Sequence, residues 1–101
     1  MTPGGPSVAG AFLDDTDGTL TVQGTEDLVL TDPNPAAWQV TFDGVPQPIS
    51  SVFTIGTSVA LSTTAGSAAE MFVSYIGGAY VIGEPSGLPL QAVTDFPVAL
   101  V

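Results

Sequence analysis

The groups with the greatest capacity for chemistry are ten carboxylates, because the sequence contains no Lys, Arg, His or Cys. The stretch from Asp14 to Gly18 (DDTDG) resembles the start of an oxygen-ligand calcium loop. Counted from Asp15, the position of the bidentate glutamate in such a loop is held by Glu26. The alternating residues Thr19 to Gln23 predict a strand, however, and the flanking helices of a calcium loop are not expected. We therefore expect a solvated hairpin turn at Asp14 to Gly18, with calcium binding as the alternative.

The same composition argues against catalysis. General bases that work at neutral pH are normally imidazoles, and nucleophiles are activated by His, Lys or a thiolate. Only paired carboxylates remain, as in glycoside cleavage, and no pattern in the sequence places two of them in one cleft. The sequence predicts a protein that is not an enzyme, with no catalytic residue, no metal site and no cofactor.

The lack of cationic side chains also bears on partners. Such a chain cannot neutralise phosphates, and it has no attraction for anionic lipid headgroups, so we expect neither nucleic acid nor membrane as a partner. No run approaches the roughly 20 apolar residues that span a bilayer, and residues 1–10 lack the charge and apolar core of a signal peptide. The carboxylates can form ion pairs only with cations on another molecule.

Three aromatic residues allow two interpretations. Trp38, Tyr75 and Tyr80 could form an exposed platform for carbohydrate. Alternatively, Trp38 is the core aromatic of a sandwich, and the tyrosines keep their hydroxyls at the rim of that core. The second interpretation is favoured.

The last 18 residues, 84–101, combine prolines with apolar side chains. A free tail of this kind would be an aggregation hazard in water. It is either a final edge strand of this chain or an arm that docks on a neighbouring subunit by strand addition. In the second case six apolar residues are the candidate partner-binding residues: Leu88, Leu90, Val93, Phe96, Val98 and Leu100.

The centre of the chain predicts a strand meander. Trp38, Val40 and Phe42 are spaced two apart, as in a strand with one buried face. Asp43-Gly44 is typical of a type I′ hairpin turn, and the prolines after it favour an edge strand. Met71 to Ile76 is apolar on both faces and favours a central strand.

Eight strands are expected in all, and no segment has a helical period. They are Val8–Leu13, Thr19–Gln23, Leu28–Leu30, Trp38–Phe42, Val52–Ile55, Ser58–Thr63, Met71–Ile76 and Ala79–Ile82, with a ninth after Asp43-Gly44 less well marked. The pattern predicts one all-β sandwich domain over residues 8–83. An N-terminal arm, residues 1–7, and the C-terminal arm or edge strand, residues 84–101, flank it.

The meander resembles the bacterial immunoglobulin-like repeats of large surface proteins, including the SwmB-type repeat. The resemblance covers Ala36 to Gly77 and rests on Trp38, Phe42, Asp43-Gly44, Val45-Pro46, Val52, Val59, Leu61, Val73 and Ser74-Tyr75. It departs from the pattern at residues 68–70 (AAE), where such repeats usually have a Gly-Asp turn. The resemblance implies an immunoglobulin-like β-sandwich.

A small acidic β module without catalytic groups acts by binding or by building. We expect a virion structural protein, namely a phage capsid decoration (cement) protein on the outer surface of the shell. It would be assembled in the host cytoplasm, it would bind the major capsid protein or other subunits of the capsid or tail surface, and it could form a homo-oligomer. The alternative is an immunoglobulin-like repeat of a bacterial cell-surface adhesin.

Overall fold

The computed structural model describes residues 6–78, 80–84 and 86–101, and these form strands, turns and one short 3₁₀ turn. The strands form where apolar and polar residues alternate, because this alternation lets each strand bury one face, and turn residues separate one strand from the next. The all-β class predicted from the sequence is confirmed. No α-helix is present in the described part of the chain.

The first sheet has five strands in the order β11-β1-β2-β7-β6. Its members are β1 (Val8–Asp14), β2 (Thr19–Gly24), β6 (Ser51–Ile55), β7 (Ser58–Ser62) and β11 (Ala99–Leu100). All neighbours are antiparallel except β1 and β11, which run parallel.

The second sheet has four antiparallel strands in the order β10-β8-β4-β5. Its members are β4 (Trp38–Phe42), β5 (Val45–Gln47), β8 (Met71–Tyr75) and β10 (Val93–Pro97). A smaller ladder pairs β3 (Leu28–Leu30) with β9 (Val81–Gly83), and the 3₁₀ turn η1 (Pro35–Ala37) leads into β4. β8 lies inside its sheet and β5 at its edge, as the sequence predicted.

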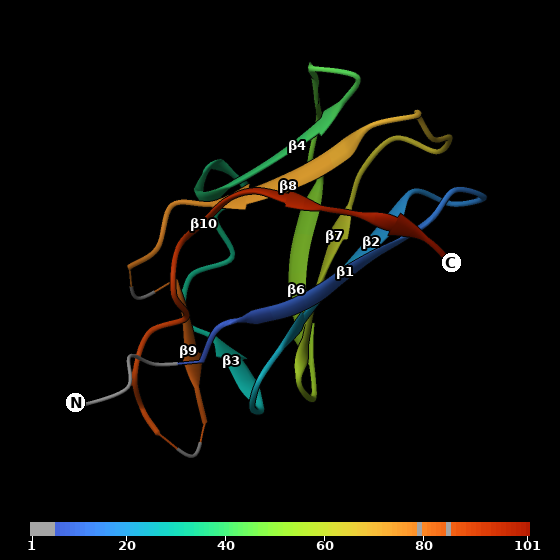
Figure 1. Ribbon diagram of the computed structural model, residues 1–101. Coiled ribbons are helices and arrows are strands. Elements are labelled where there is room, and N and C mark those ends of the chain that lie inside the picture. Colours follow the sequence, from blue (N-terminus) through green and yellow to red (C-terminus); the bar gives the residue numbers. More distant parts are fainter. Residues whose placement is uncertain (1–5, 79, 85) are drawn as a thin grey trace.

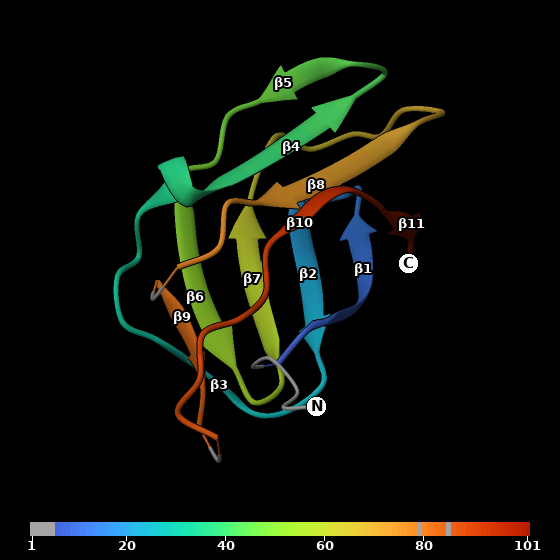
Figure 2. The same cartoon turned by 60° about the vertical axis from the view of Figure 1, so that its left-hand side comes forward.

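The two sheets pack face to face with their strands crossing obliquely (Figures 1 and 2). Inward-facing side chains of both sheets form one core, which includes Leu13, Leu20, Val40 and Val73, each with no exposed surface. Trp38 is 5% exposed and lies in this core. The sandwich therefore rests on the period-two burial that the sequence pattern indicated.

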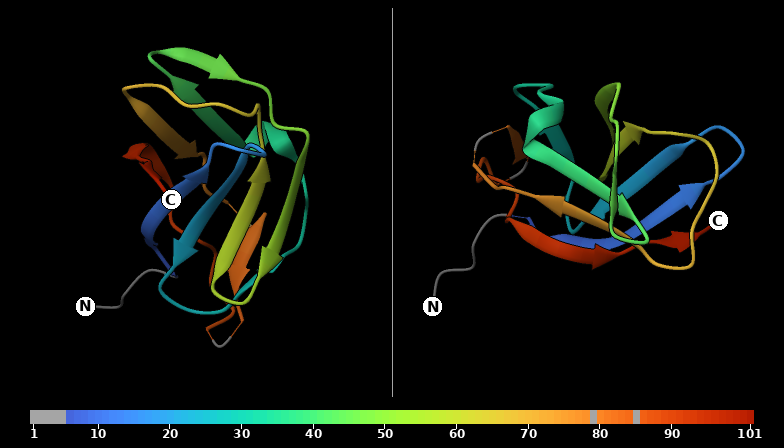
Figure 3. Two further views of the ribbon diagram at one scale, coloured as in Figure 1. Left: turned by 90° about the vertical axis from the view of Figure 1, so that its right-hand side faces the viewer. Right: turned by 90° about the horizontal axis from the view of Figure 1, so that it is seen from above.

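The C-terminal segment belongs to the sandwich rather than standing apart from it. β10 pairs with β8, and after Val98 the chain crosses to the other sheet, where β11 pairs with β1 (Figure 3). At the other terminus, residues 1–5 of the expected arm lie outside the described residues. Pro6 accepts a backbone hydrogen bond from Gln91, and Ser7 accepts one from Thr25.

The strand predicted over Ala79–Ile82 is shifted. Ala79 lies outside the described residues, and the observed strand covers Val81–Gly83. Its pairing with β3 fixes this register, since Leu28 lies opposite Gly83. A sequence period of two cannot supply that register, because it does not say which strand is the partner.

Candidate functional site

A hollow of about 490 Å³ lies on the outer face of the four-stranded sheet. Six residues line it: Thr41, Asp43, Gly44, Glu70, Phe72 and Asp95. They come from β4, from the turn after it, from β8 and the residue just before it, Glu70, and from β10. Segments far apart in the sequence are therefore brought together by the pairing of β4, β8 and β10.

The floor of the hollow is a cross-strand pair. Thr41 of β4 lies opposite Phe72 of β8, and both side chains point outward because the residues on either side of them face the core. Phe72 is half-buried. The hollow thus has one aromatic ring and one hydroxyl at its base.

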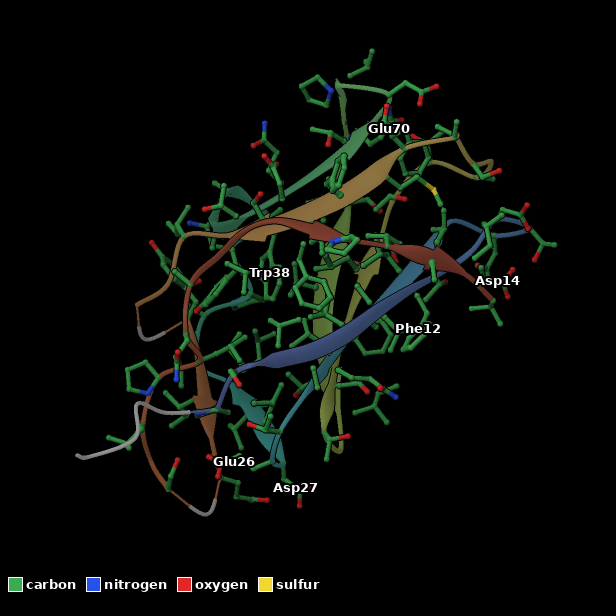
Figure 4. All side chains as sticks on the ribbon, in the orientation of Figure 1. Phe12, Asp14, Glu26, Asp27, Trp38 and Glu70 are labelled. Carbon is green, nitrogen blue, oxygen red and sulfur yellow. The ribbon has the colours of Figure 1, made fainter. Side chains whose placement is uncertain are left out.

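Asp43 and Glu70 form one rim, at the end of the β4–β8 ladder. Asp43 and Gly44 have φ of 50° and 81°, the type I′ turn predicted from the sequence. The Asp43 N–H donates to the Glu70 carbonyl at 2.7 Å, and the Glu70 N–H donates to Asp43 Oδ1 at 3.0 Å. The second bond holds the Asp43 carboxylate in place, and the first joins the two main chains, while the Glu70 side chain remains exposed at this end of the sandwich (Figure 4).

Asp95 forms the opposite rim through an irregularity in β10. The register of β10 against β8 shifts between Val93 and Phe96, and Asp95 adopts φ of 51°. Its N–H donates to Ser74 Oγ at 2.9 Å. The bulge turns an acidic residue to the hollow, as bulges commonly do when they re-aim a side chain.

Three exposed carboxylates around an aromatic floor favour a cationic group. The chain has no Lys, Arg or His to pair with them. A guanidinium or ammonium from another molecule could lie over the Phe72 ring while its N–H groups reach the rim. The carboxylates border the hollow without converging: among the described residues, no three acidic side chains are close enough to hold a metal ion.

The stretch from Asp14 to Gly18 is a hairpin turn between β1 and β2. Asp14 Oδ1 accepts from the Thr16 hydroxyl at 2.6 Å and from the Thr16 N–H at 3.0 Å, and these bonds lower the pKa of Asp14. Glu26 lies beyond the far end of β2, well away from this turn (Figure 4). The calcium-loop arrangement considered from the spacing is therefore not formed.

Trp38 and Tyr75 form a buried aromatic pair, with ring centroids 4.4 Å apart and planes tilted by 32°. Tyr75 is 1% exposed, and burial raises the pKa of its phenol. Its hydroxyl donates to the Gly78 carbonyl and accepts from the Val81 N–H, each at 3.2 Å. The carbohydrate platform is thus not formed, because two of its three rings are in the core.

The six candidate partner-binding residues of the C-terminal segment are not brought together. Leu90 and Val98 are 1% and 9% exposed and belong to this chain's own core, so neither is available to a partner. Val93 and Phe96 are half-buried against that core. Only Leu88 and Leu100, at 40% and 50%, are well exposed.

The acidic hollow was not identified from the sequence. Part of the hollow could have been predicted from the sequence, because an antiparallel pairing of the predicted strands at Trp38–Phe42 and Met71–Ile76 places Asp43 beside Glu70. Asp95 could not be assigned to the hollow from the sequence, because the sequence did not decide whether the C-terminal segment pairs within this chain or docks on a neighbouring subunit. Its backbone bulge has no sequence signal of its own.

Comparisons with protein-family models, with curated proteins and with solved structures find no match to this chain. Within the described residues, no helix has the length and apolar character needed to cross a bilayer.

Proposed function

We propose that this chain is a non-enzymatic virion structural protein, a phage capsid decoration (cement) protein that binds the major capsid protein on the outer surface of the shell. The observation that carries the proposal is the acidic hollow in a chain with no side-chain cation. Its three carboxylates can be paired only by cations of another molecule. A shell subunit that presents Arg or Lys beside the hollow supplies that complement.

We infer further that the sandwich is immunoglobulin-like. The order β1-β2-β7-β6 in one sheet and β5-β4-β8-β10 in the other corresponds to A-B-E-D and C′-C-F-G of that fold. The parallel β11 and the β3–β9 ladder are additions to this pattern. Immunoglobulin-like modules occur on many surfaces, so this inference supports a binding role without selecting the partner.

Gradient-purified virions of the phage that encodes this sequence test the proposal. Mass spectrometry should find the chain in the particles, and an antibody against it should label their outer surface in immunogold micrographs. Absence of the chain from the particles would refute a virion role. Labelling only after the shells are opened would refute decoration.

A variant series tests the hollow itself. Asp43→Asn, Glu70→Gln and Asp95→Asn together should lower binding to undecorated shells at least tenfold at low salt. Asn keeps the Oδ1 acceptor at residue 43 and tolerates the positive φ at residues 43 and 95.

The matched control neutralises Asp15, Asp32 and Glu84, which lie outside the hollow, by the same kind of change. It alters the net charge equally, and shell binding should stay within twofold of the unaltered chain. Equal losses in both triple variants would assign the effect to overall charge and contradict docking through the hollow.

One observation favours the alternative, a repeat of a bacterial cell-surface adhesin. The first described residues and Val101 lie toward opposite ends of the molecule, as domains linked in series require (Figure 3). In that case the chain should be found in the cell-envelope fraction of the bacterium and not in virus particles. The same antibody distinguishes the two functions.

A further inference from the structure

The acidic hollow on the outer face of the four-stranded sheet places carboxylates on two sides of one aromatic ring. Glu70, just before β8, comes two residues before Phe72, and Ser74 comes two residues after it. Glu70 is bonded to Asp43 of the neighbouring turn, whereas Asp95 donates its N–H to Ser74 Oγ. Asp43 and Glu70 therefore lie on one side of the Phe72 ring along the strand direction, and Asp95 lies on the other side.

Strand geometry sets the size of this arrangement. Two residues of a strand cover about 7 Å, so Glu70 and Ser74 each stand about that far from Phe72. Asp95 is displaced sideways as well, by the spacing of about 5 Å between neighbouring strands. Because the carboxylates of both rims line the same hollow as Phe72, the space between either rim and the ring fits one hydrogen-bonding group, directly or through one water.

The carboxylates of the hollow have acceptor oxygens to spare. None of the described residues donates a hydrogen bond to the carboxylate of Glu70 or of Asp95, and the Asp43 carboxylate accepts from the Glu70 N–H through Oδ1 alone. The chain has no cationic side chain that could serve as their partner. These oxygens are therefore open to donors of another molecule, and charge complementarity favours a cation.

The floor between the two rims carries no charge. Phe72 lies in an outward row with Thr41 of β4 and Pro97 of β10, and Pro46 of β5 lies opposite Thr41. Phe72 is half-buried, so part of its ring is accessible in the hollow. A cationic group that interacts with both rims must therefore lie on apolar surface and give up water there.

The two cationic groups that proteins present differ in how they fit such a floor. An ammonium is a compact and strongly hydrated charge, so it gains little from apolar surface and pairs with one rim at a time. A guanidinium is planar and more weakly hydrated, it stacks on aromatic rings, and it carries N–H donors along its edges. Placed on the Phe72 ring, it directs donors to both rims at once.

We propose that the acidic hollow is an arginine-selective site, in which one guanidinium lies flat on the Phe72 ring. Its N–H groups are directed to Asp43 and Glu70 at one rim and to Asp95 at the other. Phe72 determines the preference for arginine over lysine, and Asp95 supplies the second rim, which a single point charge does not reach. The inference rests on the proposed function for one point only, namely that a shell subunit supplies the arginine.

NMR titration of the isotope-labelled chain with N-acetyl-arginine amide and with N-acetyl-lysine amide tests the inference. Each probe carries one cationic side chain and no other charge. At low salt the arginine probe should bind about fivefold more tightly than the lysine probe, or better. Its δ-methylene protons should shift upfield on binding, because they come to lie in the ring current of Phe72. Equal affinities for the two probes would overturn the inference.

Two variants and one control assign the preference to its residues. Phe72→Leu keeps an apolar side chain but removes the aromatic ring, and Asp95→Asn neutralises the second rim while tolerating the positive φ. Each should reduce the preference for arginine to about twofold or less, with little change for the lysine probe. Phe12→Leu, the same change at a 37% exposed ring on the outer face of the other sheet, should alter neither affinity.

Circular dichroism checks that Phe72→Leu folds, and Asp95→Asn, at an exposed side chain, provides a second measurement that does not depend on the half-buried ring. A preference for arginine that survives in a folded Phe72→Leu variant would refute the inference.

Shell binding separates this inference from the proposed function. If undecorated shells bind the chain but the two probes bind equally, the arginine-selective site is refuted and capsid decoration stands. If the arginine probe is preferred but shells do not bind the chain, the site stands and capsid decoration is refuted.

Discussion

Tyr75 illustrates how few residues govern the titration of this chain at high pH. Because Lys, Arg, Cys and His are absent, the tyrosines are the only side chains that lose a proton in the alkaline range. Tyr75 is buried against Trp38, and burial raises its pKa because the phenolate would be poorly solvated. The folded state therefore holds this proton more tightly than the unfolded state does.

The sign of the pH dependence follows. Below pH about 10 the Tyr75 phenol is protonated in both the folded and the unfolded chain, so its contribution to the free energy of unfolding is fully present. As the pH rises through the raised pKa of folded Tyr75, the contribution is lost, because the unfolded chain releases the proton first. In a Tyr80→Phe variant, absorbance at 295 nm should show Tyr75 ionising at a higher pH than in the same chain in denaturant. Urea midpoints should fall above pH 10, and identical titrations in the two states would contradict a buried phenol.

Trp38 shows what the sequence can predict at this scale. It stands at a period-two position with apolar neighbours on the same face, and it is 5% exposed. Asp43-Gly44 was equally predictable, because positive φ at both positions selects few residue pairs. Asp95 was not predictable, because it adopts positive φ inside a strand, where a bulge and not residue type determines the geometry.

At the scale of elements, the C-terminal segment was the point that the sequence left open. Its prolines suppress a clear strand period, so an edge strand and a docking arm looked alike. In the structure β10 completes one sheet, and β11 covers part of β1 in the other. The segment thereby buries Leu90 and Val98, and this burial outweighs the missing ladder donors of its prolines.

A matched pair of substitutions measures this role. Leu90→Ala should lower the free energy of unfolding by about 2–5 kcal/mol, the usual range for a buried leucine. Leu88→Ala, the same change two residues earlier at a side chain that is 40% exposed, should cost less than half as much. Urea denaturation followed by circular dichroism gives both values. Similar small losses in the two variants would mean that the segment is not held in the core in solution.

The strands of the meander could be predicted from the sequence, but which strands pair with one another could be predicted only in part. Trp38–Phe42, Ser58–Ser62 and Met71–Tyr75 follow from alternation alone. The pairing of β2 with β7 and of β4 with β8 crosses long stretches of chain, and no local pattern specifies it. The acidic hollow depends on that long-range pairing, which is why the site was harder to predict than the strands.

At the scale of the whole molecule, every charged side chain has the same sign. The ten carboxylates lie mostly in turns and loops, at several ends of the sandwich (Figure 4). In an ordinary protein salt weakens attractions and repulsions together, and its net effect on stability is hard to foresee. Here the charged side chains only repel one another, so screening by salt should weaken that repulsion and stabilise the folded state.

Raising NaCl from 10 to 300 mM should therefore increase the midpoint temperature of thermal unfolding. Screening over this range shortens the Debye length from about 30 Å to less than 8 Å, below the separation of most carboxylates in a sandwich 38 Å long. Differential scanning calorimetry in the two salt concentrations measures this midpoint. A variant with Asp15→Asn, Asp32→Asn and Glu84→Gln carries a charge of −7 in place of −10, so its midpoint at 10 mM NaCl should be higher and its rise with salt smaller. A midpoint that falls as salt is added would show that attractions to the backbone, such as those at Asp14 and Asp43, exceed the repulsion between carboxylates.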